Sequence, residues 1–304
     1  MDYAFTERSL ESNVLVSRRA KPNRSQGDRY IAVADAAALR ALMKTFELFL
    51  VGALLTISFP LLGDPVTIRH IQGYLSAFVV LKGTDGKILA SGEATQLPAG
   101  NRITSVLTLH FRDGSLHEER AVFSQHRVFQ LLTYKLTQRG PSFSAPETLS
   151  FDTASGNVII ETTDKNGKPK SISKQLSLPQ DLANGIIPML LNDIDPTAET
   201  TLSMLVSTPE PRVVKLKISA SGQEPFSIGG SSAKATHYVI KVDIGGITGV
   251  AAKVTGKQPP PTHIWTAAGK WPVFLKSEGQ LYEDGPIWRI ETTTPTWQKA
   301  PEKK

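Results

Sequence analysis

Two histidines flank a predicted hairpin, and their types and spacing fit a metal site. Asp113-Gly114 is a strong signal for a two-residue turn, which would place His110 opposite His117 and Thr108 opposite Glu119. Opposite side chains of antiparallel strands lie close enough to share a ligand. Imidazole nitrogens and a carboxylate oxygen are groups that zinc accepts. The pattern offers His110, His117 and Glu119 as metal ligands, with a solvated polar face of the hairpin as the alternative.

Nucleophilic catalysis finds little support in the sequence. Ser231 has small neighbours but departs from the Gly-x-Ser-x-Gly pattern, and a triad with His237 and Asp243 would require the intervening strand to fold back. The glycines of residues 244–249 precede no helix, so they do not form a phosphate loop. The absence of Cys excludes thiolate nucleophiles and thiolate-bound metals. We therefore expect no catalytic residues and no cofactor, with a hydrolase as the least favoured reading.

Apolar residues that could bind a ligand gather in two places. One is the face of a predicted helix, whose side chains either line a cavity or fill it. The other is the C-terminal part of the chain, where all four Trp lie; these could form the rim of a ligand mouth, or could pack in the core. The candidate ligand-binding residues are Leu182, Ile186, Met189, Leu190, Trp265, Trp271 and Trp288.

The elements that must position these residues are short strands. Apolar stretches of period two alternate with turn residues from Thr67 onward, which is typical of antiparallel strands joined by hairpins. The spacing predicts strands at 78–81, 88–89, 103–112, 115–124, 128–138, 148–152, 158–163, 170–176, 200–207, 212–219, 225–228, 235–244, 247–255, 273–277 and 287–293.

One helix interrupts the strands. Apolar residues from Leu182 to Leu191 fall on one helical face, after Pro179 and Asp181 at positions typical of a helix start. This predicts a helix from about Pro179 to Asn192, kinked near Pro188. A flat sheet of so many strands curls or closes. We therefore expect an all-β fold with one main helix: a strongly bent antiparallel sheet, half-barrel or barrel-like, with the helix on its concave side.

The N-terminal part of the chain carries an apolar run. Residues 48–62 are uncharged, too short for a comfortable membrane helix and of suitable length for the core of a secretory signal. Met43 and Lys44 directly precede the run. These features predict an extension at 1–42, mis-called or disordered, a signal peptide or uncleaved anchor at 43–63, and a single β domain at 64–304. A buried core helix is the alternative for the run.

Composition limits the classes of function. The chain of 304 residues has a net charge of +6 and its basic residues are scattered along it. Such a pattern does not form the basic patch of a nucleic-acid-binding protein, so we expect no nucleic-acid partner. An apolar fraction of 40% and a charged fraction of 20% are ordinary for a folded globular chain.

The β domain resembles an uncharacterised family of bacterial exported proteins between about Ile71 and Trp297. The residues that carry the resemblance are Gly140-Pro141-Ser142-Phe143, Leu178 to Gly185 (LPQDLANG), Thr208 to Arg212 (TPEPR), Gly256 to Pro260 (GKQPP), Glu278 to Tyr282 (EGQLY) and Gly285 to Glu291 (GPIWRIE). More distantly, the architecture is similar to the open-barrel carriers of the lipoprotein-localisation type, which hold acyl chains. The first resemblance implies no activity, and the second raises the expectation of an apolar ligand.

These observations favour a periplasmic or secreted protein of the cell envelope, or one anchored by an uncleaved N-terminal segment, that binds a lipid or other apolar ligand without catalysis. Residues 48–62 could contact the membrane. The alternative is a structural or interaction module of the envelope whose concavity is packed solid. A cavity beside Ile186, Met189 and Leu190 would distinguish the first function from the second.

Overall fold

The computed structural model describes residues 65–297, apart from 165, 208–209, 229, 244–257, 270–271 and 294. The chain divides between Pro60 and Leu61 into two units, and every described residue lies in the second. No helix within the described ranges is long and apolar enough to cross a membrane.

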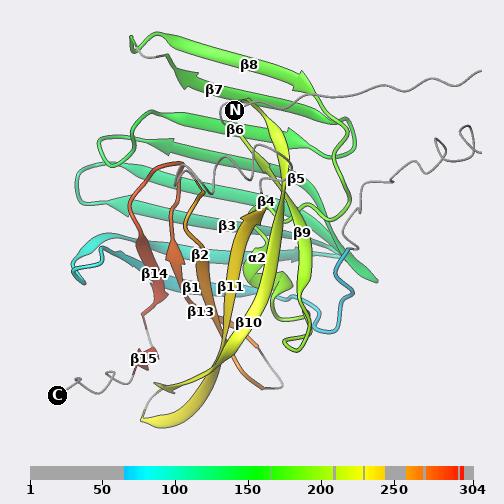
Figure 1. Ribbon diagram of the computed structural model, residues 1–304, viewed down its shortest axis with the longest axis vertical. Coiled ribbons are helices and arrows are strands. Elements are labelled where there is room, and N and C mark those ends of the chain that lie inside the picture. The colour runs from blue at the N-terminus through cyan, green and yellow to red at the C-terminus, as the bar shows by residue number, and fades with distance from the viewer. Residues whose placement is uncertain are drawn as a thin grey trace, which may run out of the picture. The chain divides into compact units, whose positions relative to one another are not determined.

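The second unit is built almost entirely of strands (Figure 1). They are β1 (Leu75–Lys82), β2 (Ile88–Ala99), β3 (Arg102–Phe111), β4 (Leu116–His126), β5 (Val128–Arg139), β6 (Glu147–Asp152), β7 (Asn157–Thr163), β8 (Pro169–Gln175), β9 (Thr200–Val206), β10 (Arg212–Ile228), β11 (Ser231–Asp243), β12 (Thr262–Ala267), β13 (Phe274–Gly279), β14 (Trp288–Thr292) and β15 (Pro295–Trp297). The described helix is α2 (Ile187–Leu190).

All 15 strands belong to one antiparallel sheet. Its order is β15-β10-β11-β12-β13-β14-β1-β2-β3-β4-β5-β6-β7-β8, and β9 pairs with β10 beside that path. β1 to β8 follow chain order because each is joined to the next by a short turn. The edge strand β8 contains Pro169, Lys170 and Lys174, and prolines and charged side chains protect an open edge against pairing with another chain.

The predicted all-β fold with a bent antiparallel sheet is confirmed, and most predicted strands are present. Two differences stand out. The strands predicted at 212–219 and 225–228 are one continuous strand, β10, which passes the intervening polar residues by a bulge between Ala220 and Gly222. β12 was missed because THIWTA lacks a clear alternation. The strand predicted at 247–255 lies outside the described residues.

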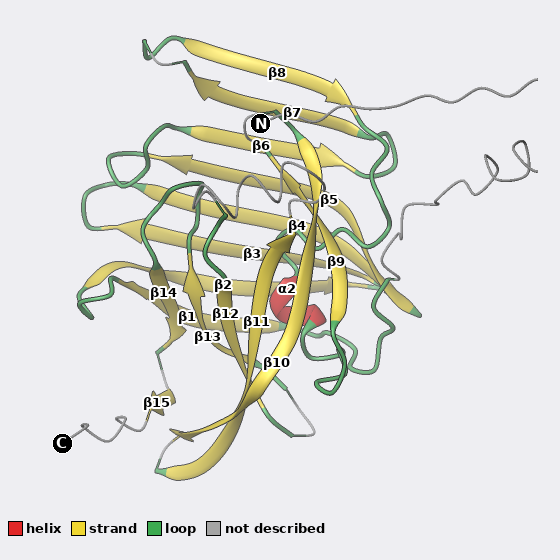
Figure 2. Ribbon diagram, in the orientation of Figure 1, coloured by secondary structure: helices red, strands yellow, loops and turns green. Residues whose placement is uncertain are grey.

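The predicted helix at 179–192 is wrong in extent, because α2 has four residues. The first half of the segment pairs with β9 instead: Leu182 forms a parallel bridge with Ser203, and Ala183 N donates to Ser203 O at 2.9 Å. Gly185 then adopts a left-handed φ of 69°, a conformation that ends helical geometry. The helix α2 lies inside the bend of the sheet, as expected for a helix on the concave side (Figure 2).

The concave face holds the main core. Residues from β3 to β7 meet residues from β9 to β12 across the 182–194 segment, so the two limbs of the bent sheet are joined through it. Among its members, Phe123, Ile186, Leu202 and Ile218 are each at most 1% exposed. The concave face of the sheet is thus buried by the 182–194 segment, which connects β8 to β9.

A second, smaller core lies on the opposite face. Ile264 belongs to the main core and its neighbour Trp265 to a cluster with Phe226, Ala235 and Leu275, because successive residues of a strand point to opposite faces. β15 follows β14 after two residues and pairs with the end of β10. The cluster is formed by side chains of β10 to β13, and the sheet as a whole stays open.

Candidate functional site

The Asp113-Gly114 turn has a different register from the predicted one. Phe111 N donates to Ser115 O and Gly114 N to Phe111 O, so the loop has three residues, with Gly114 at a φ of 86°. His110 therefore pairs with Leu116, and Leu109 with His117. A shift of one residue sends every side chain of a strand to the other face.

The predicted metal site at His110, His117 and Glu119 is accordingly wrong. His110 is exposed on the outer face, whereas His117 is 3% exposed on the inner face. Glu119 shares the inner face with His117 but bonds to a tyrosine. No group of three His, Cys, Asp or Glu side chains that could hold a metal occurs within the described ranges.

His117 instead belongs to a buried polar row. Gln138, its partner on β5, places Nε2 3.0 Å from His117 Nδ1 and donates from the same nitrogen to Leu281 O at 2.8 Å. An amide nitrogen only donates, so His117 Nδ1 accepts and the ring proton resides on Nε2. That Nε2 is buried without a hydrogen-bond partner among the described residues. Burial lowers the pKa of His117 to about 4.

Two carboxylates continue this row. Tyr134 Oη donates to Glu119 Oε1 at 2.6 Å, and Ser207 Oγ donates to Glu147 Oε2 at 3.0 Å. Burial raises the pKa of Glu119 against the hydrogen bond from Tyr134. Burial also raises the pKa of Glu147, opposed by its bond to Ser207. Each carboxylate has its own hydroxyl partner, so in this row of the concave face it is His117 Nε2 that stays without one.

The predicted ligand-binding residues of the helical segment are brought together in the main core. Leu182, Ile186, Met189 and Leu190 are between 1% and 5% exposed and pack with side chains from both limbs of the sheet. The sequence left open whether these side chains line a cavity or fill it, and their packing against both limbs of the sheet favours the second interpretation.

The predicted tryptophans do not form one cluster. Trp288 packs with Phe111, Phe143 and Tyr282 on the concave face, whereas Trp265 lies in the small core on the other face. Trp271 lies outside the described residues, and for Trp297 the structure describes the backbone pairing with β10. Trp265 and Trp288 therefore act as core residues of different clusters.

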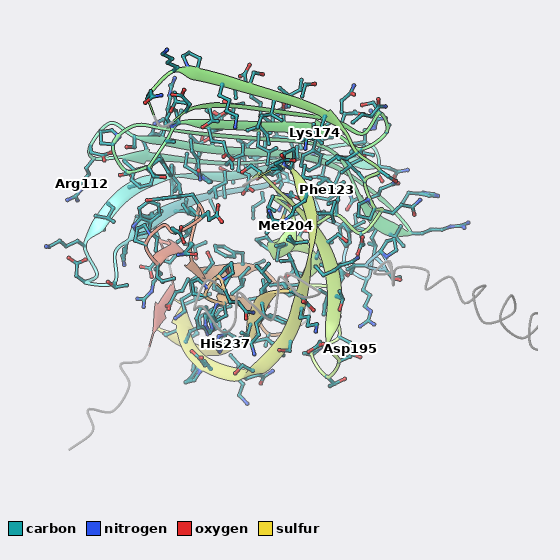
Figure 3. The ribbon with its side chains drawn as sticks, turned by 45° about the horizontal axis from the view of Figure 1, so that its top comes forward. Arg112, Phe123, Lys174, Asp195, Met204 and His237 are labelled. Carbon is teal, nitrogen blue, oxygen red and sulfur yellow. The ribbon has the colours of Figure 1, made fainter. Side chains whose placement is uncertain are left out.

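A histidine pair on the small-core side was missed by the sequence analysis. His237 of β11 stacks on Trp265 with ring centroids 4.2 Å apart, its Nε2 lies 2.9 Å from His263 Nδ1, and its Nδ1 lies 3.2 Å from Glu224 Oε1. Figure 3 shows His237 within the curve of the β10–β11 hairpin. Burial lowers the pKa of His237, against the attraction of Glu224. Only the long-range register, which pairs His237 with Trp265, reveals this group.

A second missed group combines a serine, a lysine and an aspartate. Ser203 Oγ donates to Asp181 Oδ1 at 2.7 Å and accepts from Lys215 Nζ at 2.8 Å, while Lys215 Nζ also lies 3.3 Å from Asp181 Oδ2. A serine beside a lysine can act as a nucleophile, but Ser203 is 0% exposed. The group therefore fastens the 178–194 segment to β9 and β10.

A groove of about 310 Å³ crosses β4 to β7. It is lined by the basic residues Arg120 and Lys135, the apolar residues Tyr134, Phe151 and Ile159, and several polar groups of β6 and the turn after it. This volume is at the lower end for a small-molecule site. The groove could hold a small amphiphile with an anionic group.

Comparison with known proteins assigns no activity to the chain. No protein-family model matches it, and no curated protein does. A solved structure from Brucella abortus, a beta-barrel-like protein of a domain of unknown function (DUF1849), is similar over 77% of this chain and 100% of that one, with 7% sequence identity and a TM-score of 0.41. The similarity is to a bacterial protein that itself has no assigned function.

Proposed function

We propose that the protein is a non-catalytic interaction module of the bacterial cell envelope, exported by the N-terminal segment 43–63. The observation that carries this proposal is the filled concavity: Ile186, Met189 and Leu190, the residues expected to border a ligand cavity, are buried in the main core. Protein interiors are close-packed, so an acyl chain could enter there only by displacing the 182–194 segment. The partner therefore meets the protein at its surface.

A second candidate function is binding of a small apolar ligand, and the groove across β4 to β7 favours it. Ile159, which is 43% exposed, would contact the apolar part, and Arg120 and Lys135 would attract an anionic group. This keeps the expected lipid-like ligand but moves it from the concavity to the outer groove.

The test is expression of the whole chain in a bacterial host, followed by cell fractionation, native mass spectrometry and organic extraction. If the protein is an interaction module of the envelope, we expect it in the envelope fraction without a stoichiometric lipid. Protein confined to the cytosol would overturn the export. A stoichiometric lipid that persists in the Arg120→Gln variant would support a carrier with an internal site, whereas a lipid lost from that variant would support the groove.

A further inference from the structure

The chain enters the sheet at one defined end. Thr67 forms a bridge with Val128, Ile68 N donates to Arg127 O at 2.9 Å, and Phe129 N donates to Val66 O at 3.0 Å. Residues 66–68 are thereby fixed beside the β4–β5 turn, in the blue segment of Figure 1.

Side-chain bonds extend this attachment. Gln72 N donates to Gln125 Oε1 at 2.8 Å, and Gln125 Nε2 donates to Gln72 O at 2.9 Å. The backbone N–H groups of Arg69 and His70 donate to Asp193 Oδ1 at 2.5 and 2.7 Å. The segment that precedes β1 is therefore held in one place, although its residues Ile71 and Tyr74 stay exposed.

The four most exposed large apolar side chains of the described chain gather at this end. Ile71, Phe78, Tyr74 and Leu97 are 80%, 74%, 71% and 52% exposed. Phe78 pairs with Glu93 on β2, and Leu97 lies four residues further along β2, so Phe78 and Leu97 share a face. Apolar groups gathered on a surface mark an interaction site.

Basic side chains border the same end. Arg102 begins β3 opposite Ala99, two residues from Leu97, and Arg127 occupies the β4–β5 turn; both are exposed. Arg69 is exposed as well, but its charge acts on Asp195 and lowers the pKa of that carboxyl, after the hydrogen bonds from Thr197. Arg102 and Arg127 are thus the cations most available to a partner. Glu93 beside Phe78 marks the limit of the surface.

We propose that this apolar-basic surface, formed by Ile71, Tyr74, Phe78, Leu97, Arg102 and Arg127, docks on an anionic lipid bilayer. Exposed aromatic and aliphatic side chains insert at the headgroup level, and neighbouring arginines attract anionic lipids. The proposal deepens the proposed function and rests on it for the membrane's presence.

The position of the surface along the chain favours a membrane over a protein partner. Ile71 follows the apolar run 48–62 by nine residues, which span at most about 30 Å when extended. A run that is anchored in, or exported across, a membrane would therefore release the sheet with this end nearest the bilayer. A second copy of the chain would instead have to bring like-charged arginines together.

The absence of Cys from the chain allows the test to be local. Tyr74→Cys carries an environment-sensitive fluorophore in the full-length protein, reconstituted with vesicles of phosphatidylglycerol and phosphatidylcholine. Ile88→Cys is the matched control, because Ile88 is 37% exposed at the opposite end of the β1–β2 ladder, about 30 Å along β2 from Leu97. We expect a blue shift and quenching by brominated lipids at position 74 but not at position 88.

The charge dependence provides a second measurement. Each arginine near an anionic surface contributes about 1 kcal/mol, so Arg102→Gln should reduce the docked-to-undocked ratio about fivefold. Arg127→Asn should do the same, and Asn tolerates the positive φ of 65° at this position. Removing both arginines should reduce the ratio about 25-fold. Replacing phosphatidylglycerol with phosphatidylcholine should also reduce the ratio.

Other outcomes separate the two proposals. Protein that floats with vesicles but shows no shift at position 74 would overturn the docking surface and leave the envelope module standing. A cytosolic location in cells with a shift in vesicles would overturn the module alone. Equal shifts at positions 74 and 88, or a concentration-dependent shift without vesicles, would overturn lipid docking in favour of unspecific adsorption or a second copy.

Discussion

Replacing His117 should change how the stability of the protein depends on pH. Its pKa is lowered to about 4 in the folded protein by burial, whereas an unfolded histidine titrates near 6.5. Below pH 6.5 the unfolded chain binds a proton that the folded chain does not, so the free energy of unfolding falls as pH falls. From pH 7 to pH 4 this single group removes about 3 kcal/mol of stability.

The variant His117→Leu isolates this contribution. Gln138 keeps its hydrogen bond to Leu281 O in the variant, and the ring nitrogen without a partner is removed. The difference in unfolding free energy between the variant and the wild type should therefore shift by about 3 kcal/mol in favour of the variant between pH 7 and pH 4. Taking the difference matters, because Glu119 and Glu147, whose pKa values burial raises, oppose the trend in both proteins.

Urea unfolding followed by tryptophan fluorescence at half-unit pH steps measures the effect. His110→Leu is the matched control, because it replaces an exposed histidine of the adjacent strand and should change stability by less than about 0.5 kcal/mol. Parallel pH curves for His117→Leu and the wild type would refute the reasoning, since they would mean that His117 is charged or solvated in the folded protein.

Three further substitutions test the packing by urea unfolding. Gly185→Ala should lower the free energy of unfolding by about 1–3 kcal/mol more than Gly167→Ala. Both glycines have positive φ, but a Cβ at 185 would lie 3.0 Å from Tyr134, whereas one at 167 would meet nothing within 4 Å. Equal losses would contradict the close approach. Ser203→Ala should lower the free energy of unfolding by about 1–3 kcal/mol, because it leaves Asp181 and Lys215 without their shared hydroxyl. A loss no larger than that of the exposed Ser232→Ala would show that the group does not fasten the 178–194 segment. Phe226→Ala, in the small core, should lower the free energy of unfolding by about 3–5 kcal/mol, whereas Phe78→Ala, on the exposed surface, should hardly change it. The reverse order would contradict both the burial of Phe226 and the exposure of Phe78.

The local features of the fold could be predicted from the sequence because hairpins are local. Each strand from β1 to β7 is followed in the chain by its partner, so alternation and turn residues suffice to place it. The helical segment shows the limit of such patterns. The apolar spacing of residues 182–191 fits a helix, but β9 lies close in the folded chain and offers Ser203 and Leu205 as backbone partners, and tertiary pairing overrides a weak helix interrupted by Gly185.

The candidate sites were less predictable, because each depends on a register or a contact between distant residues. One extra loop residue beside Gly114 was enough to separate His110 from His117. Conversely, His237 and His263 are 26 residues apart and meet through the pairing of β11 with β12. No local spacing indicates that contact.

The exposed end of the sheet is informative because its backbone is held in place while its apolar side chains stay in solvent. Ile71 and Tyr74 lie in a segment that already bonds to the β4–β5 turn and to Asp193, so its backbone is ordered at an entropic cost of about 1–2 kcal/mol per residue. That ordering covers none of the four most exposed apolar side chains at this end. The 182–194 segment packs into the concavity of the sheet, whereas the apolar and basic side chains at this end stay exposed to solvent. These exposed side chains closely follow the apolar run in the sequence, and this coincidence makes the bilayer the partner to test first.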